Sequence, residues 1–259
     1  MWLEIILLAI VQGIAEFLPI SSSGHVVVGM ALCDQLGHPL DEKLTVNIVL
    51  HLGTLAAIVV FYWKRIVGLL GEDRRVIGLL LVGSIPAGVA GLVLEKHFTA
   101  VLEDPLTAGL MFLVTGLMLL WSARHEGGRT TCRELGYGQA LLIGLAQAVA
   151  ILPGMSRSGS TIVAGLGVGL RRDEAATFSF LLAIPAIGGA GLLKVIELAR
   201  DGGGSVPISL LAVGATVSFA VGLVSLWWLV RWLQRGWLHH FAWWVIPLGL
   251  IVIAWRMFG

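Results

Sequence analysis

The chain has 259 residues, of which 57% are hydrophobic and 13% are charged, and its formal net charge is +1. A mean hydropathy of +0.92 excludes an ordinary soluble domain. The near-zero net charge excludes the broad basic surface that binds nucleic acid. The composition therefore predicts an all-α polytopic membrane protein that forms one domain over residues 1–259.

The predicted elements form two similar series along the chain. First comes an apolar stretch at roughly residues 2–36, which a proline and a serine/glycine turn interrupt. Three uninterrupted stretches of about 20 residues, enough for a helix to cross a bilayer, follow at Leu44–Trp63, Val76–Leu94 and Leu106–Trp121. A second interrupted stretch lies at roughly residues 135–170, and three more spans follow it at Thr177–Leu198, Ile208–Trp232 and Phe241–Trp255.

Basic residues indicate how these stretches are oriented. Lysine and arginine gather in alternate loops, at residues 64–75, 124–133, 171–172 and 231–235, as they do on the cytoplasmic side of membranes. Six crossings with these loops inside place both chain ends outside, and each interrupted stretch must then return to the side from which it came. We therefore expect two re-entrant helical hairpins in an inverted-topology repeat, with repeat 1 at roughly residues 1–123 and repeat 2 at roughly residues 135–259.

The interrupted stretches carry related motifs, QGIAEFLPISSSGH at residues 12–25 and QAVAILPGMSRSGS at residues 147–160. A shift of 135 positions aligns their glutamines and also aligns Gly24 with Gly159. The same shift places Glu16 on an isoleucine, and only the second motif contains an arginine, Arg157. Polar groups in apolar membrane segments are costly and mark functional sites. We therefore expect the acid of one hairpin and the cation of the other to share a cavity.

Gln12 and Glu16 are four residues apart and face the same side of the first half-helix. One interpretation is a polar pair that satisfies itself within the bundle. The other makes Glu16 a general acid or base, or a metal ligand, with Gln12 orienting it or the substrate.

His25 lies beside three serines, Ser21, Ser22 and Ser23, in the turn that opens the return helix. A neutral imidazole can remove a proton from a serine or a water molecule, or attack phosphorus itself. We expect Ser22 to be the hydroxyl nearest to it.

Arg157 stands between Ser156 and Ser158 at the tip of the second hairpin. Its planar guanidinium suits phosphate oxygens, and a salt bridge to Glu16 is the alternative. Serine/glycine turns that open helices present free amides to an anion, so both turns together could grip a diphosphate. In this interpretation Gly24 and Gly159 let the backbone approach the ligand, and Ser23 and Ser158 cap the helices.

Other polar residues are less informative. His51 lies in a predicted span and is either a partner of the site or a helix-packing residue. His239 and His240 stand among tryptophans, Trp237, Trp243 and Trp244, that are typical of a membrane interface. Cys33 and Cys132 are expected on opposite sides of the membrane, so a disulfide between them is not predicted.

The two motifs, QGIAEFLPISSSGH and PGMSRSG, resemble the signatures of the undecaprenyl-diphosphate phosphatase family of the bacitracin-resistance type. LHLGT and FSFLLAIPA also resemble family segments, so the resemblance extends over essentially the whole chain. It implies an enzyme of the bacterial inner membrane that hydrolyses undecaprenyl diphosphate to undecaprenyl phosphate, recycles the lipid carrier for peptidoglycan synthesis and confers resistance to bacitracin.

The resemblance also implies roles for individual residues. Glu16 matches the second acidic position of the family's first motif, and Gln12 matches the first, which some members fill with glutamate. Ser22 and His25 match the catalytic serine and histidine, and Arg157 matches the arginine that holds phosphate. The family uses a divalent cation such as Mg²⁺ or Ca²⁺ and no organic cofactor. With glutamine at position 12, a metal that arrives with the diphosphate is expected.

A transporter or lipid flippase is the alternative function, because inverted repeats with broken helices are a transporter architecture. The predicted cavity opens to the outer, periplasmic side in either case. The sequence does not define the oligomeric state, and a dimer is compatible with it.

Overall fold

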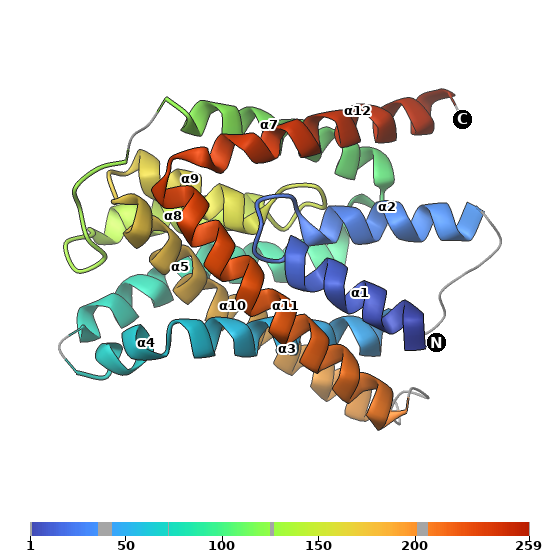
Figure 1. Cartoon of the computed structure of the whole chain (residues 1–259), viewed down its shortest axis with the longest axis horizontal. Helices are drawn as coiled ribbons and strands as arrows, with labels where there is room; N and C mark the ends of the chain where they lie inside the picture. The colour runs from blue at the N-terminus through green and yellow to red at the C-terminus, as the bar shows by residue number, and fades with distance from the viewer. Residues whose placement is uncertain (1, 36–42, 72, 125–126, 201–206, 259) are drawn as a thin grey trace.

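A computed structural model of the protein describes residues 2–35, 43–71, 73–124, 127–200 and 207–258. These residues fold almost entirely into helices (Figure 1). The helices are α1 (Trp2–Ala15), α2 (Ser22–Gln35), α3 (Lys43–Phe61), α4 (Trp63–Leu69), α5 (Arg74–His97), α6 (Thr99–Leu102), α7 (Pro105–Ser122), α8 (Tyr137–Val149), α9 (Arg157–Gly167), α10 (Arg172–Arg200), α11 (Ile208–Gln234), the 3₁₀-helix η1 (Trp237–Phe241) and α12 (Ala242–Phe258).

Five helical segments within the described residues are long and apolar enough to cross a membrane. They are α5, α7, α10 over Arg172–Ile196, α11, and η1 together with α12. Helices α3 and α4 form a sixth candidate that bends by 74° at their junction. Each candidate coincides with one of the six predicted spans, so the prediction of an all-α, multi-pass membrane protein is confirmed.

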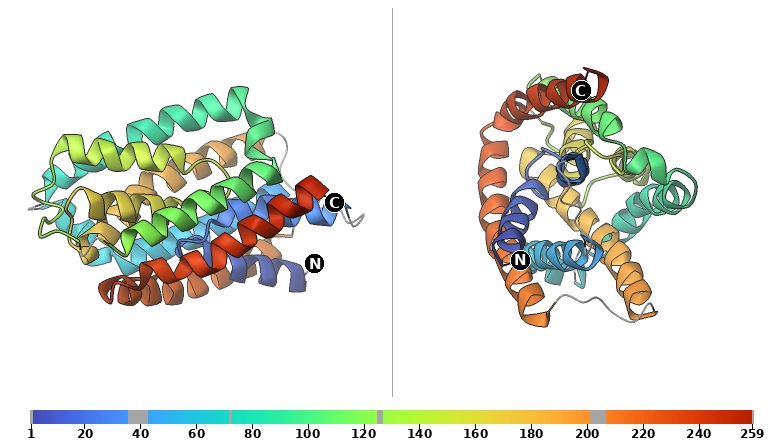
Figure 2. Two further views of the ribbon diagram at one scale, coloured as in Figure 1. Left: turned by 90° about the horizontal axis from the view of Figure 1, so that it is seen from above. Right: turned by 90° about the vertical axis from the view of Figure 1, so that its right-hand side faces the viewer.

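Proline and the serine/glycine turns break the chain where the motifs predict. Residues 16–21 separate α1 from α2, and residues 150–156 separate α8 from α9. Figure 1 shows that the α1–α2 pair opens toward the end of the molecule that holds both chain termini, whereas the α8–α9 pair opens toward the opposite end. The two breaks lie next to each other, and both further views show them enclosed by the longer helices (Figure 2).

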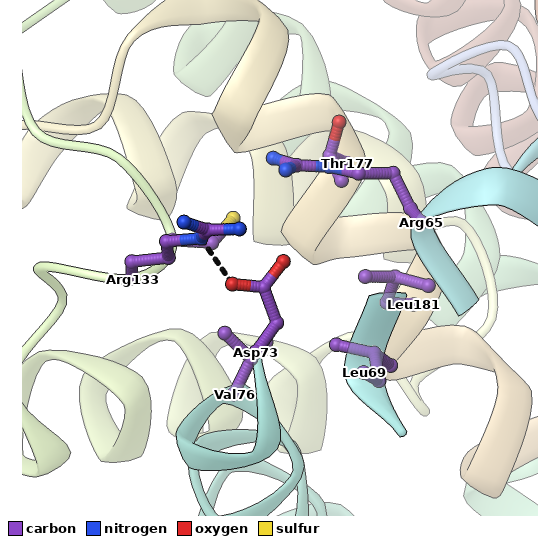
Figure 3. Close-up of a pocket in the computed structure, with 8 residues that line it drawn as sticks. Arg65, Leu69, Asp73, Val76, Arg133, Thr177 and Leu181 are labelled. Carbon is purple, nitrogen blue, oxygen red and sulfur yellow. Dashed lines mark ion pairs between the residues drawn. The ribbon is translucent and has the colours of Figure 1, made fainter. Parts of the chain in front are cut away.

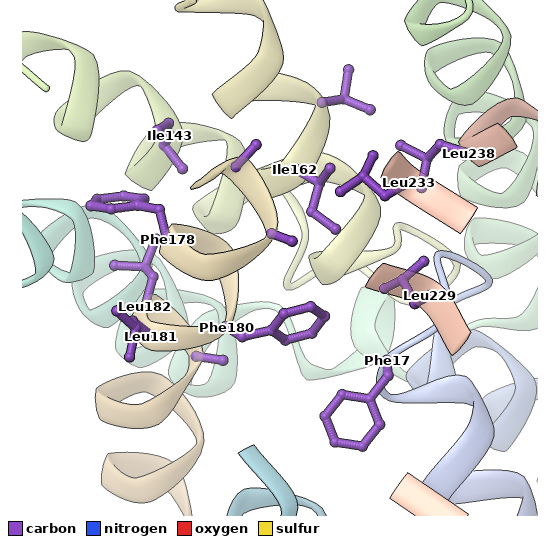
Figure 4. Close-up of a cluster of buried hydrophobic side chains, with 14 of the residues drawn as sticks. Phe17, Ile143, Ile162, Phe178, Phe180, Leu181, Leu182, Leu229, Leu233 and Leu238 are labelled. Carbon is purple, nitrogen blue, oxygen red and sulfur yellow. The ribbon is translucent and has the colours of Figure 1, made fainter. Parts of the chain in front are cut away.

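A core of buried aromatic and aliphatic side chains surrounds the breaks. It includes Phe17 from the first break, Phe180 from α10 and Leu229 from α11, all of which are fully buried (Figure 4). The rings of Phe17 and Phe180 lie 5.7 Å apart and tilt against each other. Side chains such as Leu117 and Ile251 are instead exposed on the outside, where lipid replaces water as their surroundings.

The tips of the two helix pairs pack directly against each other. A Cβ atom on Gly24 would lie 2.6 Å from both the Cα and the N of Gly154, so only glycine permits this approach. Gly154 has a positive φ of 88° and is itself pressed against α7, where its Cβ would lie 2.1 Å from the carbonyl oxygen of Ala108. On the other side, Gly159 faces Pro19 of the first break. The tips therefore form one packed unit.

The helix caps lie two residues earlier than the sequence predicted. The hydroxyl of Ser156 accepts the Gly159 amide at 3.1 Å and caps α9, and the hydroxyl of Ser21 accepts the Gly24 amide at 3.3 Å at the start of α2. The predicted caps, Ser23 and Ser158, are wrong because both helices begin before them. The observed caps, Ser21 and Ser156, occupy equivalent positions when the two motifs are aligned by the shift of 135 residues.

Candidate functional site

A small cavity lies where the two helix breaks meet. Both motifs line it, with Ala15, Glu16, Ser21, Ser22 and Ser23 from the first and Ala150, Met155, Ser156, Arg157 and Ser158 from the second. Its volume of about 40 Å³ leaves room for a few water molecules, and a diphosphate would not fit wholly within it. Side chains or helices must therefore move before a large ligand can bind.

The carboxylate of Glu16 is the centre of this cavity. Its Oε2 accepts hydrogen bonds from the Gln12 amide at 3.1 Å and from the Ser22 hydroxyl at 3.0 Å. Its Oε1 accepts a hydrogen bond from Nη2 of Arg157 at 3.0 Å. The side chain of Glu16 is 7% exposed, so the carboxylate depends on these donors in place of water. The predicted meeting of the acid and the cation is confirmed.

Arg157 retains an unused donor. Its Nη2 donates to Glu16, but its Nη1 is buried and has no hydrogen-bond partner among the residues that the structure describes. The guanidinium carbon lies over the Phe180 ring, 6.0 Å from its centre, so the ring face makes a cation–π contact with the guanidinium. An unsatisfied buried N–H group is unfavourable, and an anionic oxygen would satisfy it.

The five predicted serines all line the cavity, but they make different contacts. Only Ser22 contacts the carboxylate of Glu16. Ser21 and Ser23 share a hydrogen bond of 3.3 Å, and Ser156 and Ser158 share one of the same length. Among these serines, Ser22 is therefore the one whose hydroxyl the structure pairs with a carboxylate.

Four predicted site residues do not line the cavity, and one of them, Gln12, contacts the site through its hydrogen bond to Glu16. Gly24 and Gly159 pack between the tips, because each is pressed against the opposite break. His25 faces away from Ser22: its Nδ1 lies 2.7 Å from the carbonyl oxygen of Ser21, and its Nε2 lies 3.1 Å from the indole nitrogen of Trp244. Neither ring nitrogen of His25 therefore bonds to Ser22, whose hydroxyl points to Glu16, and Ser22 as the hydroxyl nearest to the imidazole stays a prediction.

His51, for which the sequence left two interpretations, contacts the site. Its Nδ1 lies 2.8 Å from the carbonyl oxygen of Asn47, and because a carbonyl only accepts, Nδ1 carries the hydrogen. Its Nε2 lies 3.6 Å from Oε2 of Glu16. The contact supports the interpretation of His51 as a partner of the site.

Two further residues were missed from the sequence. Thr115 of α7 donates to the carbonyl of Gly154 at 2.9 Å and accepts the amide of Ser156 at 3.1 Å, so it fixes the second break. Trp244 of α12 holds His25, as described above. A lone threonine or tryptophan in an apolar helix carries no local signal of such a contact.

The residues present do not fit a metal ion that the protein holds by itself. Among the described residues, no group of three or more His, Cys, Asp or Glu side chains is arranged to bind one. Glu16 is the single carboxylate among the described lining residues, and its oxygens already accept three hydrogen bonds. Mg²⁺ and Ca²⁺ require several oxygen ligands.

Figure 3 shows a second, smaller cavity, which lies beside α4 at the end of the molecule opposite the chain termini (Figure 1). Ion pairs bridge its walls: Asp73 pairs with Arg133, and Arg65 pairs with Glu174. Burial raises the pKa of the Cys132 thiol, and the neighbouring Glu174 raises it further, so this cysteine stays protonated. With its charges paired and its thiol inert, the cavity is part of the packing between α4, α5 and α10.

The fold and the site define a class: a polytopic membrane protein in which two broken helix pairs bring one carboxylate, one serine hydroxyl and one guanidinium together. The chain matches the family model described as bacitracin resistance protein BacA over residues 5–251, and it belongs to that family.

Relatives share most of their length with this chain. An undecaprenyl-diphosphatase of Rhodopirellula baltica is 52% identical over 252 residues, which cover 97% of this chain and 96% of the relative. An undecaprenyl-diphosphatase of Methanosphaera stadtmanae is 39% identical, again over 97% of this chain and 96% of the relative. Undecaprenyl-diphosphatase 4 of Bacillus cereus is 39% identical over 98% of this chain and 96% of its own.

Proposed function

We propose that this protein hydrolyses undecaprenyl diphosphate to undecaprenyl phosphate and inorganic phosphate. It thereby returns the lipid carrier to peptidoglycan synthesis and confers resistance to bacitracin, which sequesters the diphosphate. Family membership and the names of the relatives support this activity. The observation that carries the proposal is the Glu16 carboxylate, which holds the hydroxyl of Ser22 and the guanidinium of Arg157 at once.

The geometry supports a mechanism with Ser22 as the nucleophile. Glu16 removes the hydroxyl proton while Oγ of Ser22 forms a bond to the terminal phosphorus and the bridging P–O bond breaks, releasing undecaprenyl phosphate. Arg157 and the positive N-terminus of α9 neutralise the charge that spreads over the phosphoryl oxygens. Water then cleaves the phosphoserine and releases phosphate. The alternatives, in which His25 removes the proton or attacks phosphorus, require His25 to leave its present contacts.

The test is phosphate release from a short-chain prenyl diphosphate by the detergent-solubilised protein. Ser22→Ala should lower the rate by more than about 10³-fold, as loss of a nucleophile does. Ser122→Ala is the matched control, because the hydroxyl of Ser122 contacts only its own helix, at the carbonyl of Leu119. Wild-type rates in Ser22→Ala would remove Ser22 from the mechanism, and no phosphate release by the wild type would refute the function.

We further propose six crossings and two re-entrant hairpins in an inverted repeat, with the cavity and both chain ends on the outer side of the bacterial inner membrane. The opposite openings of the α1–α2 and α8–α9 pairs support this arrangement (Figure 1). In a variant whose own cysteines, Cys33 and Cys132, are replaced by serine, a membrane-impermeant maleimide applied to cells should label Gln35→Cys directly and Arg171→Cys only after permeabilisation. The reverse pattern would overturn the orientation.

A divalent cation, Mg²⁺ or Ca²⁺, is proposed to reach the site on the diphosphate. The single carboxylate of the cavity supports a metal that the substrate carries. Calorimetry should then detect no tight binding of Mg²⁺ to the protein alone, and EDTA should stop turnover. Tight binding without substrate would contradict this proposal.

Lipid translocation is a second candidate function, and the two broken helix pairs that open to opposite ends favour it. Vesicles that contain the protein and a fluorescent prenyl phosphate distinguish the two activities. A carrier would move this lipid between leaflets without any cleavage.

A further inference from the structure

We infer that His25 and Trp244 act as a pair of positioning residues: the imidazole holds the peptide that carries Ser22, and the indole holds the imidazole. The inference rests on the proposed hydrolysis, and it gives His25 a role other than base or nucleophile.

Both nitrogens of the His25 ring are engaged. Nδ1 lies 2.7 Å from the carbonyl oxygen of Ser21, which can only accept, so Nδ1 carries the hydrogen. Nε2 lies 3.1 Å from Nε1 of Trp244, and an indole N–H can only donate, so Nε2 is the acceptor. The edge-on ring of Phe112, 5.2 Å away, packs against the imidazole. These partners are all neutral, and together they fix one tautomer and one ring orientation.

The carbonyl that the imidazole holds is next to the reacting serine. It belongs to the planar peptide unit that joins Ser21 to Ser22, so its direction sets where the Ser22 side chain begins. Ser21 has a φ of 67° and is the one non-glycine residue with positive φ in the described part of the chain. Such a conformation is unfavourable for a residue with a side chain and persists only where neighbouring groups enforce it. The His25 ring contributes to that enforcement, because its bond to the Ser21 carbonyl at 2.7 Å adds to the one that the His25 backbone amide donates to the same oxygen at 3.3 Å.

Trp244 acts through His25, because it does not line the cavity. It projects from α12 onto α2 and remains 57% exposed. A second tryptophan of α12 makes the same kind of bond at the far end of α2, where Nε1 of Trp255 donates to Oε1 of Gln35 at 3.1 Å. The two indoles attach the same helix pair, but only one of them contacts His25.

Replacing His25 by glutamine separates positioning from acid–base or nucleophilic chemistry. An amide can donate to the Ser21 carbonyl and accept from Trp244, but it can neither remove a proton nor form a bond to phosphorus. His25→Ala should lower kcat about 10²-fold by misplacing Ser22. His25→Gln should recover most of that loss, with kcat within about tenfold of wild type. Equal losses in the two variants, in an otherwise active protein, would overturn the inference.

The two tryptophans provide the second test. Trp244→Phe keeps an aromatic ring and removes only the N–H donor, so kcat should fall about tenfold, as for one neutral hydrogen bond, while KM stays near wild type. Trp255→Phe should leave both parameters unchanged. Equal effects of the two variants would indicate general loosening of α2 and overturn the pairing.

A spectroscopic measurement separates this inference from the proposed function. In ¹⁵N-histidine spectra, with His25 assigned by difference from His25→Gln, the wild type should show a protonated Nδ1 and an unprotonated Nε2. Trp244→Phe should shift the Nε2 signal, and Trp255→Phe should not. The opposite tautomer would refute the pairing, whereas absence of phosphate release from the wild type would refute the hydrolysis itself.

Discussion

Replacing Arg157 by lysine separates the two tasks of its guanidinium. One donor, Nη2, pairs with Glu16 at 3.0 Å, and the other, Nη1, is buried without a partner and is available to a phosphoryl oxygen. Lysine keeps the charge next to Glu16, but its compact ammonium group lacks the planar fork that reaches a carboxylate and a phosphate together. Methionine has a similar length and removes both donors and the charge.

The magnitudes follow from these contacts. Arg157→Met leaves Glu16 as a buried, uncompensated carboxylate, which should reduce the free energy of unfolding by about 3–5 kcal/mol. Arg157→Lys preserves the ion pair and should lose no more than about 1 kcal/mol. Loss of one preorganised donor to the transition state should still lower kcat/KM of the lysine variant by about 10²–10³-fold.

Thermal unfolding in detergent measures the first effect, and phosphate release from a prenyl diphosphate measures the second. Full activity in Arg157→Lys would show that a point charge suffices, and it would contradict the catalytic role of the planar guanidinium. If Arg157→Lys were as unstable as Arg157→Met, lysine would not preserve the ion pair with Glu16, and the predicted difference in stability would be wrong.

Three other predictions follow from single contacts. Gly24→Ala should lower both the melting temperature and the activity, because its Cβ would lie 2.6 Å from the backbone of Gly154. Gly29→Ala on the same helix, whose Cβ would meet nothing within 4 Å, should be neutral or stabilise the protein by up to about 1 kcal/mol. Equal effects of the two variants would contradict the packing of the tips. Because Nδ1 of His51 donates to Asn47, its Nε2 can donate to Glu16 only when the ring carries both protons. His51→Leu removes this donor and should lower kcat/KM about tenfold, whereas the amide of His51→Gln can also donate and should leave kcat/KM near wild type. The same kinetics in both variants would show that the contact does not contribute. At Asp104, burial raises the pKa, but hydrogen bonds from Thr107 and the Leu106 amide outweigh it and hold the pKa below its usual range. Asp104→Ala should therefore cost about 1 kcal/mol at neutral pH as a lost helix cap, and its difference in melting temperature from wild type should shrink as the pH falls below about 4. A difference that does not change with pH would contradict this account.

The parts of this protein that depend on local sequence were predictable. Hydropathy located the candidate spans, and Pro19 and Pro153 located the breaks, because each effect acts within a few residues. The meeting of Glu16 with Arg157 was also predictable, since each motif contains one half of a complementary pair.

The contacts of His25 were not predictable. Trp244 follows it by 219 residues, and only the packing of both α2 and α12 against α7 brings the two rings together. The roles of Gly24 and Gly159 were missed for a similar reason, since a glycine in a turn can face a ligand or another backbone and the sequence does not distinguish the two.

The contact between Gly24 and Gly154 limits what this protein can do at one moment. Because the contact is between backbones, no rotation of a side chain can separate the tips, and the backbone of at least one of them has to move. A passage for a lipid headgroup that opened between the tips would therefore separate the carboxylate of Glu16 on one tip from the guanidinium of Arg157 on the other. If one molecule both hydrolyses and translocates lipids, the two activities must alternate, because the contact between Glu16 and Arg157 is broken during every transfer.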